Sequence, residues 1–185
     1  MGRVALYGMF ALGALIALAV ATFVLFGGLY RAPSESMVPT IEAGDRFAVL
    51  KLGEPGIGDV VVLHPPKGAE GNIAEMCGGG APPAGQMCAK PAGGRAAVSF
   101  VKRIVAEGGD SISMRGGKLV RNGRRETTDG PRACEGDACE FPGELTVPEG
   151  HVFVLGDNRG ASDDSRFWGP VPEDWVIGRY WFGVS

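Results

Sequence analysis

Histidine is scarce in this sequence, and no long block of basic residues occurs. The 185 residues carry a net charge of −3 with both signs interspersed, which gives nucleic-acid binding little support. The two histidines, His64 and His151, lie at the ends of predicted strands, where ordinary structural roles explain them. A nucleophilic site built on a serine and a histidine is therefore disfavoured.

Cysteines at the spacing typical of metal sites are also absent. The four cysteines stand as Cys77/Cys88 and Cys134/Cys139, and neither pair has the two-residue spacing of zinc knuckles or thioredoxin-like motifs. We therefore expect no metal site, and nothing in the sequence indicates an organic cofactor. Two local disulfides are the favoured interpretation, with free thiols as the alternative. Disulfides would place their domain in an oxidising compartment, across a membrane from the cytoplasm.

Charge is missing from the N-terminal run Val4–Tyr30, which has 27 residues and is flanked by Arg3 and Arg31. As a helix it would be ~40 Å long, more than the ~30 Å of a bilayer's hydrocarbon core. A cleaved signal peptide is the alternative, but the apolar part of a signal peptide is typically only about 7–15 residues long. The sequence therefore predicts a cytoplasmic tip and a single transmembrane anchor over residues 1–31, followed by one extracytoplasmic domain over 32–185.

Helical periodicity is not well signalled beyond this run, whereas turn-forming residues are abundant, with 31 glycines and 13 prolines. This composition favours a mainly β fold with an antiparallel sheet. Two excursions, 67–96 and 122–148, are predicted to lie outside that fold. The strands that we expect are 46–52, 59–64, 97–105, 111–114, 118–121, 151–155 and 176–182.

Reactive groups concentrate at three places: Ser34 and Ser36, Lys102 and Arg103, and the polar run 157–166. Alternation along the strand 97–105 puts Lys102 on a face otherwise made of Val, Phe and Ile. Burial there would lower the pKa of its ammonium group, so that a neutral lysine could serve as a base in place of histidine. The alternative is a lysine that extends past its apolar neighbours to water.

Three segments resemble the signature boxes of type I signal peptidases, the serine–lysine dyad family S26, and occur in that family's order. They are Pro33-Ser-Glu-Ser-Met-Val-Pro-Thr40, Phe100-Val-Lys-Arg-Ile-Val105 through Asp110, and Gly156-Asp-Asn-Arg-Gly-Ala-Ser-Asp-Asp-Ser-Arg-Phe-Trp-Gly169. The strand Gly58–Val62 also matches the family's Gly-Asp-Val-Val-Val. The resemblance implies a signal-peptidase fold, an antiparallel sheet or partial barrel behind one N-terminal transmembrane helix. It also implies a dyad that needs no histidine and no cofactor.

The family assigns roles to eight positions of this sequence. It implies Ser36 as nucleophile and Lys102 as general base, with the Ser36 N–H and the Ser34 hydroxyl forming an oxyanion hole. The supporting residues that it implies are Ser162, which would orient the lysine, and the ion pairs Asp164–Arg166 and Arg103–Asp157. The alternative for these pairs is a surface location of little energetic value.

The activity implied by the resemblance is removal of signal peptides from exported preproteins with Ala-x-Ala cleavage sites. It would take place on the periplasmic side of the bacterial inner membrane, at the lipid bilayer and in the vicinity of the export translocon. Alternatives are a specialised peptidase for conjugation or pilin maturation, and an inactive protein that binds signal sequences. The chain departs from the family pattern at Ala106-Glu-Gly-Gly-Asp110, which lacks a usual proline, and at Glu35, where a small residue is common.

Overall fold

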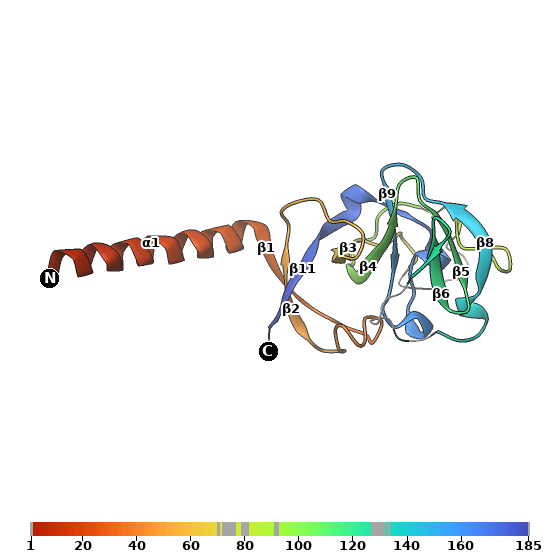
Figure 1. Ribbon diagram of the computed structural model, residues 1–185, viewed down its shortest axis with the longest axis horizontal. Coiled ribbons are helices and arrows are strands. Elements are labelled where there is room, and N and C mark those ends of the chain that lie inside the picture. The colour runs from red at the N-terminus through yellow and green to blue at the C-terminus, as the bar shows by residue number, and fades with distance from the viewer. Residues whose placement is uncertain are drawn as a thin grey trace.

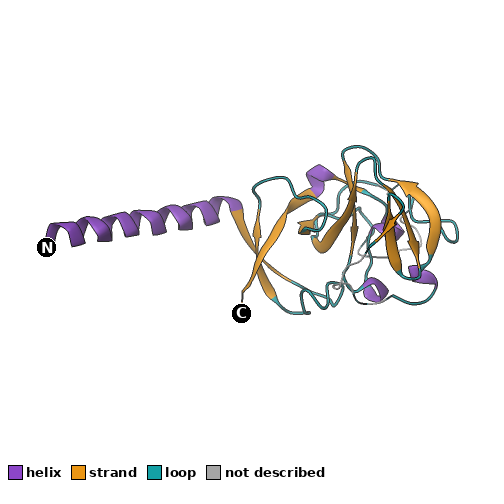
Figure 2. Ribbon diagram, viewed as in Figure 1, coloured by secondary structure: helices purple, strands orange, loops and turns teal. Residues whose placement is uncertain are grey.

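The computed structural model describes residues 2–69, 71, 77–78, 82–90, 93–126, 132 and 134–184. A single long helix, α1, projects from a body of strands that are joined by long loops and a few short helices (Figures 1 and 2). The prediction of a mainly β fold with an antiparallel sheet is confirmed.

Helix α1 spans Gly2–Phe26 and is followed without a break by strand β1, Gly27–Arg31. The expected helix through Tyr30 is therefore wrong over its last residues, because residues 27–31 pair as a strand with residues 46–50. At Gly27 the backbone lies close to the preceding turn. A Cβ there would lie 2.6 Å from the carbonyl oxygen of Phe23. No helix in the described part of the chain combines the length and apolar character needed to cross a membrane.

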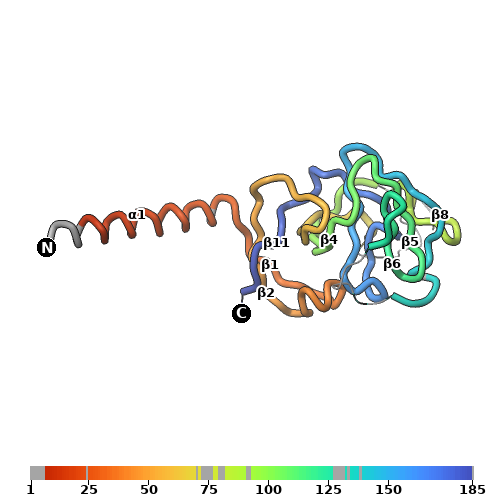
Figure 3. The backbone as a smooth tube through the Cα atoms, in the orientation of Figure 1, coloured from red at the N-terminus to blue at the C-terminus, as the bar shows by residue number. Residues whose placement is uncertain are grey.

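The larger sheet has seven strands in the order β1-β2-β11-β3-β4-β9-β10, and every neighbouring pair is antiparallel. Its strands after β1 are β2 Arg46–Leu50, β3 Val60–Leu63, β4 Phe100–Glu107, β9 His151–Leu155, β10 Val171–Pro172 and β11 Val176–Val184. All five longer strands after β1 were predicted, because alternating or continuous β-branched residues mark them. The C-terminal part of β11 pairs with β2, and β2 separates it from β1; this edge of the sheet lies close to the end of α1 (Figure 3).

The smaller sheet has four antiparallel strands in the order β7-β6-β5-β8. The strands are β5 Ser111–Arg115, β6 Lys118–Arg121, β7 Arg124–Arg125 and β8 Phe141–Thr146. The predicted hairpin of β5 and β6 is confirmed, and Gly116 and Gly117 at its turn have φ values of 57° and 70°. Such left-handed values suit glycine in a two-residue hairpin turn.

Both expected excursions contribute to the body of the protein, which corrects the prediction that they lie outside it. Segment 122–148 supplies β7 and β8, and the described part of 67–96 buries Met87 against the smaller sheet. Disulfides join Cys77 to Cys88 and Cys134 to Cys139, with Cα–Cα distances of 5.5 and 5.6 Å.

Four short helices of the described residues lie in the loops between strands, two of them in or just after the polar loop 156–166 that follows β9. They are the 3₁₀ turns η2 Asp137–Cys139, η3 Arg159–Ala161 and η4 Glu173–Trp175, and the helix α2 Ser165–Trp168. The sequence predicted only a polar loop at η3 and α2. Asp164 caps α2 by accepting a hydrogen bond from the Arg166 N–H, and Trp168 is buried against β3, β4 and β9.

Candidate active site

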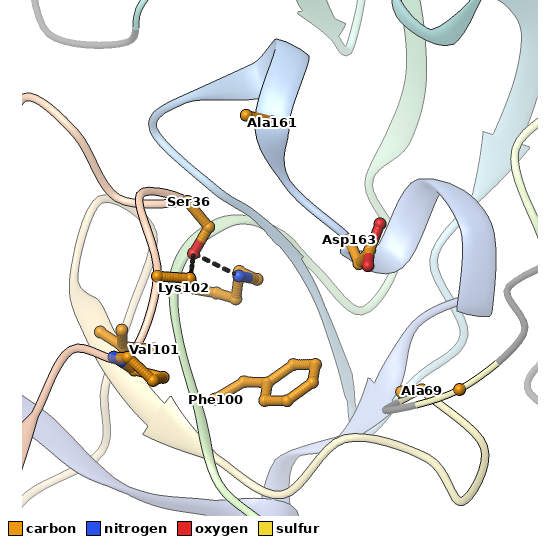
Figure 4. Close-up of a pocket in the computed structure, with 10 residues that line it drawn as sticks. Ser36, Ala69, Phe100, Val101, Lys102, Ala161 and Asp163 are labelled. Atoms are coloured by element: carbon orange, nitrogen blue, oxygen red, sulfur yellow. Dashed lines mark hydrogen bonds between the residues drawn. The ribbon is translucent and has the colours of Figure 1, made fainter. Parts of the chain in front are cut away.

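Ser36 and Lys102, 66 residues apart in sequence, meet in the structure. The Lys102 Nζ donates a hydrogen bond of 2.9 Å to the Ser36 Oγ (Figure 4). Both residues are almost fully buried, with exposures of 5% and 4%. The predicted burial of this lysine on the apolar face of β4 is therefore confirmed.

Ser36 stands in the turn segment between β1 and β2, where buried apolar neighbours hold it in place. Met37 and Ile41 pack in the core with β2, β3 and β4. The Ser36 carbonyl accepts a hydrogen bond of 3.0 Å from the Asn158 N–H, and the Asn158 side chain donates to the Glu35 carbonyl at 3.1 Å. The backbone of the serine is thus fixed by the loop that follows β9.

The hydroxyl of Ser34 lies next to that of Ser36. The Ser34 Oγ donates a hydrogen bond of 3.3 Å to the Ser36 Oγ. Both serines line the same cavity as Lys102. A hydroxyl donor at this distance from a nucleophile could stabilise negative charge that develops on a bound carbonyl. Glu35, between the two serines, is exposed and is not among the residues that line the cavity.

The pKa of Lys102 is lowered from 10.5 to about 8, chiefly because burial desolvates and so disfavours the ammonium form. The positive charge of Arg166 acts in the same direction, whereas the carboxylates of Asp164, Asp163 and Asp157 oppose it. The net effect leaves half of the amine neutral at a pH near 8. A neutral amine 2.9 Å from a hydroxyl oxygen can accept its proton.

The ion pair between Asp164 and Arg166 is completely buried. The Arg166 Nε lies 2.7 Å from one carboxylate oxygen, and the Gly156 N–H donates to the other at 3.0 Å. Burial raises the pKa of Asp164, but Arg166 and the Gly156 N–H outweigh this effect and hold the pKa below its usual value. Arg166 also donates to the carbonyls of Arg159 and Ser162, so the pair joins several points of the loop.

The second predicted pair, Arg103–Asp157, is also formed. The Arg103 Nε and Nη2 lie 2.8 and 2.5 Å from the two oxygens of Asp157, which is fully buried. The Thr40 hydroxyl donates to the same carboxylate. Asp157 therefore ties the polar loop to β4 and to the segment that carries Ser36. The alternative of a surface pair is wrong for Asp164–Arg166, whereas Arg103 is a quarter exposed.

Ser162 is buried, and its hydroxyl has no hydrogen-bond partner among the described residues. The structure thus contains no hydrogen bond between this hydroxyl and Lys102, and the orienting role remains a prediction. Gly156 makes room for this serine. A Cβ on Gly156 would clash with the Ser162 side chain and would lie 2.5 Å from the Ser36 carbonyl oxygen.

Sequence reasoning missed one strong contact of the polar loop, between Arg159 and Glu126. The buried Arg159 donates two hydrogen bonds, of 2.9 and 3.0 Å, to the carboxylate of Glu126 and one to the Gly156 carbonyl. Glu126 lies in the segment that was expected to be outside the fold. No local sequence pattern marks it as a partner of a residue 33 positions away.

A cavity of about 560 Å³ opens over Ser36 and Lys102. The residues that line it are Pro33, Ser34, Ser36, Ala69, Gly71, Phe100, Val101, Lys102, Ala161 and Asp163. Small and apolar side chains form most of this wall. No group of three or more metal-ligating side chains occurs in the described part of the chain.

Comparison with known proteins places the chain in a family. It matches the model of "Signal peptidase, peptidase S26" over residues 4–184. It is 32% identical to the probable signal peptidase I-1 of Synechocystis sp., with 81% of this chain and 67% of that protein aligned. It is also 32% identical to signal peptidase I of Leptolyngbya laminosa, over 91% and 72%.

The probable thylakoidal processing peptidase 2 of Arabidopsis thaliana is 35% identical over 80% of this chain and 36% of its own length. A signal peptidase I crystal structure from Enterococcus faecalis aligns with 69% of this chain and 97% of its own, at 24% identity and a TM-score of 0.44. The match along almost the whole chain agrees with the three signature segments, and the chain belongs to the signal peptidase family, peptidase S26.

Proposed function

We propose that this protein is a membrane-bound serine endopeptidase that removes N-terminal signal peptides from exported preproteins. Ser36 is the nucleophile and Lys102 is the general base. The observation that carries the proposal is the buried lysine Nζ, 2.9 Å from the serine Oγ, with a pKa lowered to about 8.

In the first half of the reaction, the neutral Lys102 amine takes the proton of the Ser36 hydroxyl while Oγ attacks the scissile carbonyl. The oxyanion that forms accepts hydrogen bonds from the Ser36 N–H and the Ser34 hydroxyl. The Lys102 ammonium then gives its proton to the departing amine, and the signal peptide remains as an ester on Ser36. Water, deprotonated by the same lysine, hydrolyses this ester and restores both residues.

The other predicted site residues support the dyad. Asp164–Arg166 and Arg103–Asp157 hold the loop after β9 against β4 and against the segment that carries Ser36. Ser162 orients the lysine, and its buried hydroxyl, without a partner among the described residues, is available for this contact.

We also propose that α1 anchors the protein in the bacterial inner membrane, with its catalytic domain, residues 32–185 and β1, on the periplasmic side. The side chains of α1 are exposed from Tyr7 to Ala21, and so is Leu25; Phe10 and Leu15 are among the large apolar ones. Exposed apolar surface of this extent favours a lipid environment. Near the end of α1, the ring centre of Phe23 lies 6.4 Å from that of Trp181. Trp181 is exposed, and tryptophan is enriched at membrane interfaces.

The proposal predicts cleavage directed by small residues. Detergent-solubilised full-length protein should cut a preprotein with an Ala-x-Ala site after the second alanine, because the cavity beside Ser36 is lined by small and apolar groups. A matched preprotein with tryptophan in place of that alanine should remain intact. Mass spectrometry of the new N-terminus identifies the cut bond.

Failure to cut the alanine substrate, with cutting of a pilin or conjugation precursor instead, would show a specialised peptidase. Tight binding of the substrate without cleavage would show an inactive signal-sequence-binding protein. Equal cutting of both matched preproteins would contradict selection by size.

The pH dependence follows from the state of Lys102, which acts as a base only when neutral. We expect kcat/KM to rise with pH and to level off above an apparent pKa of about 8. At pH 6 the neutral fraction is about a hundredfold lower than on the plateau, so kcat/KM should fall about a hundredfold. Initial rates from pH 5.5 to 10 measure this profile. A rise that begins only near the pKa of free lysine would contradict the proposed base.

A further inference from the structure

One carboxylate faces the cavity from the loop opposite Ser36. Among the described lining residues, Asp163 is the only acidic one, and it lies with Ala161 across the cavity from the serine (Figure 4). No role in the reaction proposed above uses this side chain.

Asp163 differs from the other aspartates of its loop, Asp157 and Asp164, because no arginine is paired with it at salt-bridge distance. Asp157 is held by Arg103 and Asp164 by Arg166, whereas Asp163 has no hydrogen bond or ion pair within the described residues. Partial burial raises the pKa of Asp163, and the neighbouring Asp164 also raises it, whereas the charges of Lys102 and Arg166 lower it; the net pKa is raised. This carboxylate would therefore gain from a positive partner.

Two cations of the described residues act on Asp163 from a distance, Lys102 and Arg166, but each is engaged elsewhere. Lys102 is hydrogen-bonded to Ser36 and must be neutral to act as a base. Arg166 is committed to Asp164 and to backbone carbonyls. When a substrate fills the cavity and displaces water, the free-energy cost of keeping the Asp163 carboxylate charged rises, unless the substrate supplies a cation beside it.

From this placement we propose that Asp163 is a substrate-selecting residue, which favours preproteins with a lysine or arginine side chain close to the cleaved bond. The basic side chain would extend along the cavity wall formed by Phe100 and Ala161 and end at the carboxylate. The inference rests on the proposed peptidase function and adds a preference for charge to it.

The experiment is a scan of charge along one preprotein. Lysine or glutamate is placed in turn at each position from −5 to +3 around the cleaved bond, apart from the small residues at −3 and −1. For each position, kcat/KM for the lysine substrate is divided by kcat/KM for the glutamate substrate. This ratio cancels any change in the amount of active enzyme or in the protonation of Lys102.

Four full-length proteins are compared: wild type, Asp163→Asn, Asp163→Lys and the control Glu42→Gln. Glu42 is exposed, and its substitution changes net charge by the same amount as Asp163→Asn without touching the cavity. Wild type should show a ratio of about ten at one or two neighbouring positions, as expected for a partly screened ion pair and the matching repulsion.

In Asp163→Asn the ratio should fall to about one, in Asp163→Lys it should drop below one, and in Glu42→Gln it should equal wild type. Raising the salt concentration should weaken the wild-type ratio. The inference is overturned if the ratios of wild type and Asp163→Asn agree at every position. Loss of all cleavage by wild type would instead refute the peptidase function, so the two failures are distinguishable.

Discussion

Replacing Ser36 by alanine, or Lys102 by methionine, should lower kcat/KM for a preprotein by about 10⁴-fold or more, the size of loss seen when serine peptidases lose nucleophile or base. Each change removes one end of the 2.9 Å contact on which proton transfer depends. Methionine preserves most of the volume of lysine in the buried site, so the fold should survive. Active-site burst and steady-state cleavage assays measure the loss.

The double variant Ser36→Ala/Lys102→Met should be no less active than either single variant, because the two groups act as one unit. Lys51→Met, which removes an exposed lysine outside the cavity, should leave the rate unchanged. Near-normal activity of Lys102→Met would exclude the lysine as base, and another group near Ser36 would have to be sought.

The largest effect on stability is expected from Asp164→Asn. The substitution keeps the shape of the side chain but leaves the guanidinium of Arg166 without its buried counter-charge. Breaking a buried pair in this way costs about 3–5 kcal/mol of the free energy of unfolding. Urea unfolding at pH 7, followed by tryptophan fluorescence, measures the difference from wild type.

Arg179→Gln provides the control, because Arg179 and Asp59 form an exposed pair 4.0 Å apart whose loss should cost no more than about 1 kcal/mol. The pH dependence adds a second test. The pKa of Asp164 is lower in the folded than in the unfolded protein, so its contribution is fully present above pH 3.8 and is lost as pH falls through the folded value. Equal losses in the two variants would show that the buried pair is not a main source of stability.

The strands with regular patterns could be predicted from sequence, and those set by tertiary contacts could not. β9 coincides with the predicted His151–Leu155, because its apolar run is bounded by turn residues. β8 was missed since Pro142 and Gly143 favour a loop, yet pairing with β5 and the packing of Phe141 on Phe167 hold this segment extended. β1 was missed because apolar residues continue from helix to strand, and only its pairing with β2, a tertiary contact, distinguishes the strand.

The same distinction applies to the candidate site. The signature segments identified Ser36, Lys102 and both ion pairs, because each lies inside a recognisable motif. The partner of Arg159, by contrast, is Glu126, the residue that follows β7 of the smaller sheet, and only tertiary packing brings the two together. Contacts between distant segments depend on register and packing, which a single sequence does not encode in any local pattern.

The direct junction between α1 and β1 has a consequence for how enzyme and substrate find each other. Because β1 starts at the residue after Phe26 and pairs at once with β2, no flexible tether joins the helix to the sheet. With α1 in the proposed bilayer, Ser36 can lie at most about 35 Å above the helix end, ten residues along the chain. The enzyme then meets a membrane-inserted substrate by lateral diffusion in the plane of the bilayer, with Ser36 at a fixed height above the membrane. An identical Ala-x-Ala sequence farther from the membrane, in a folded exported protein, would remain uncut.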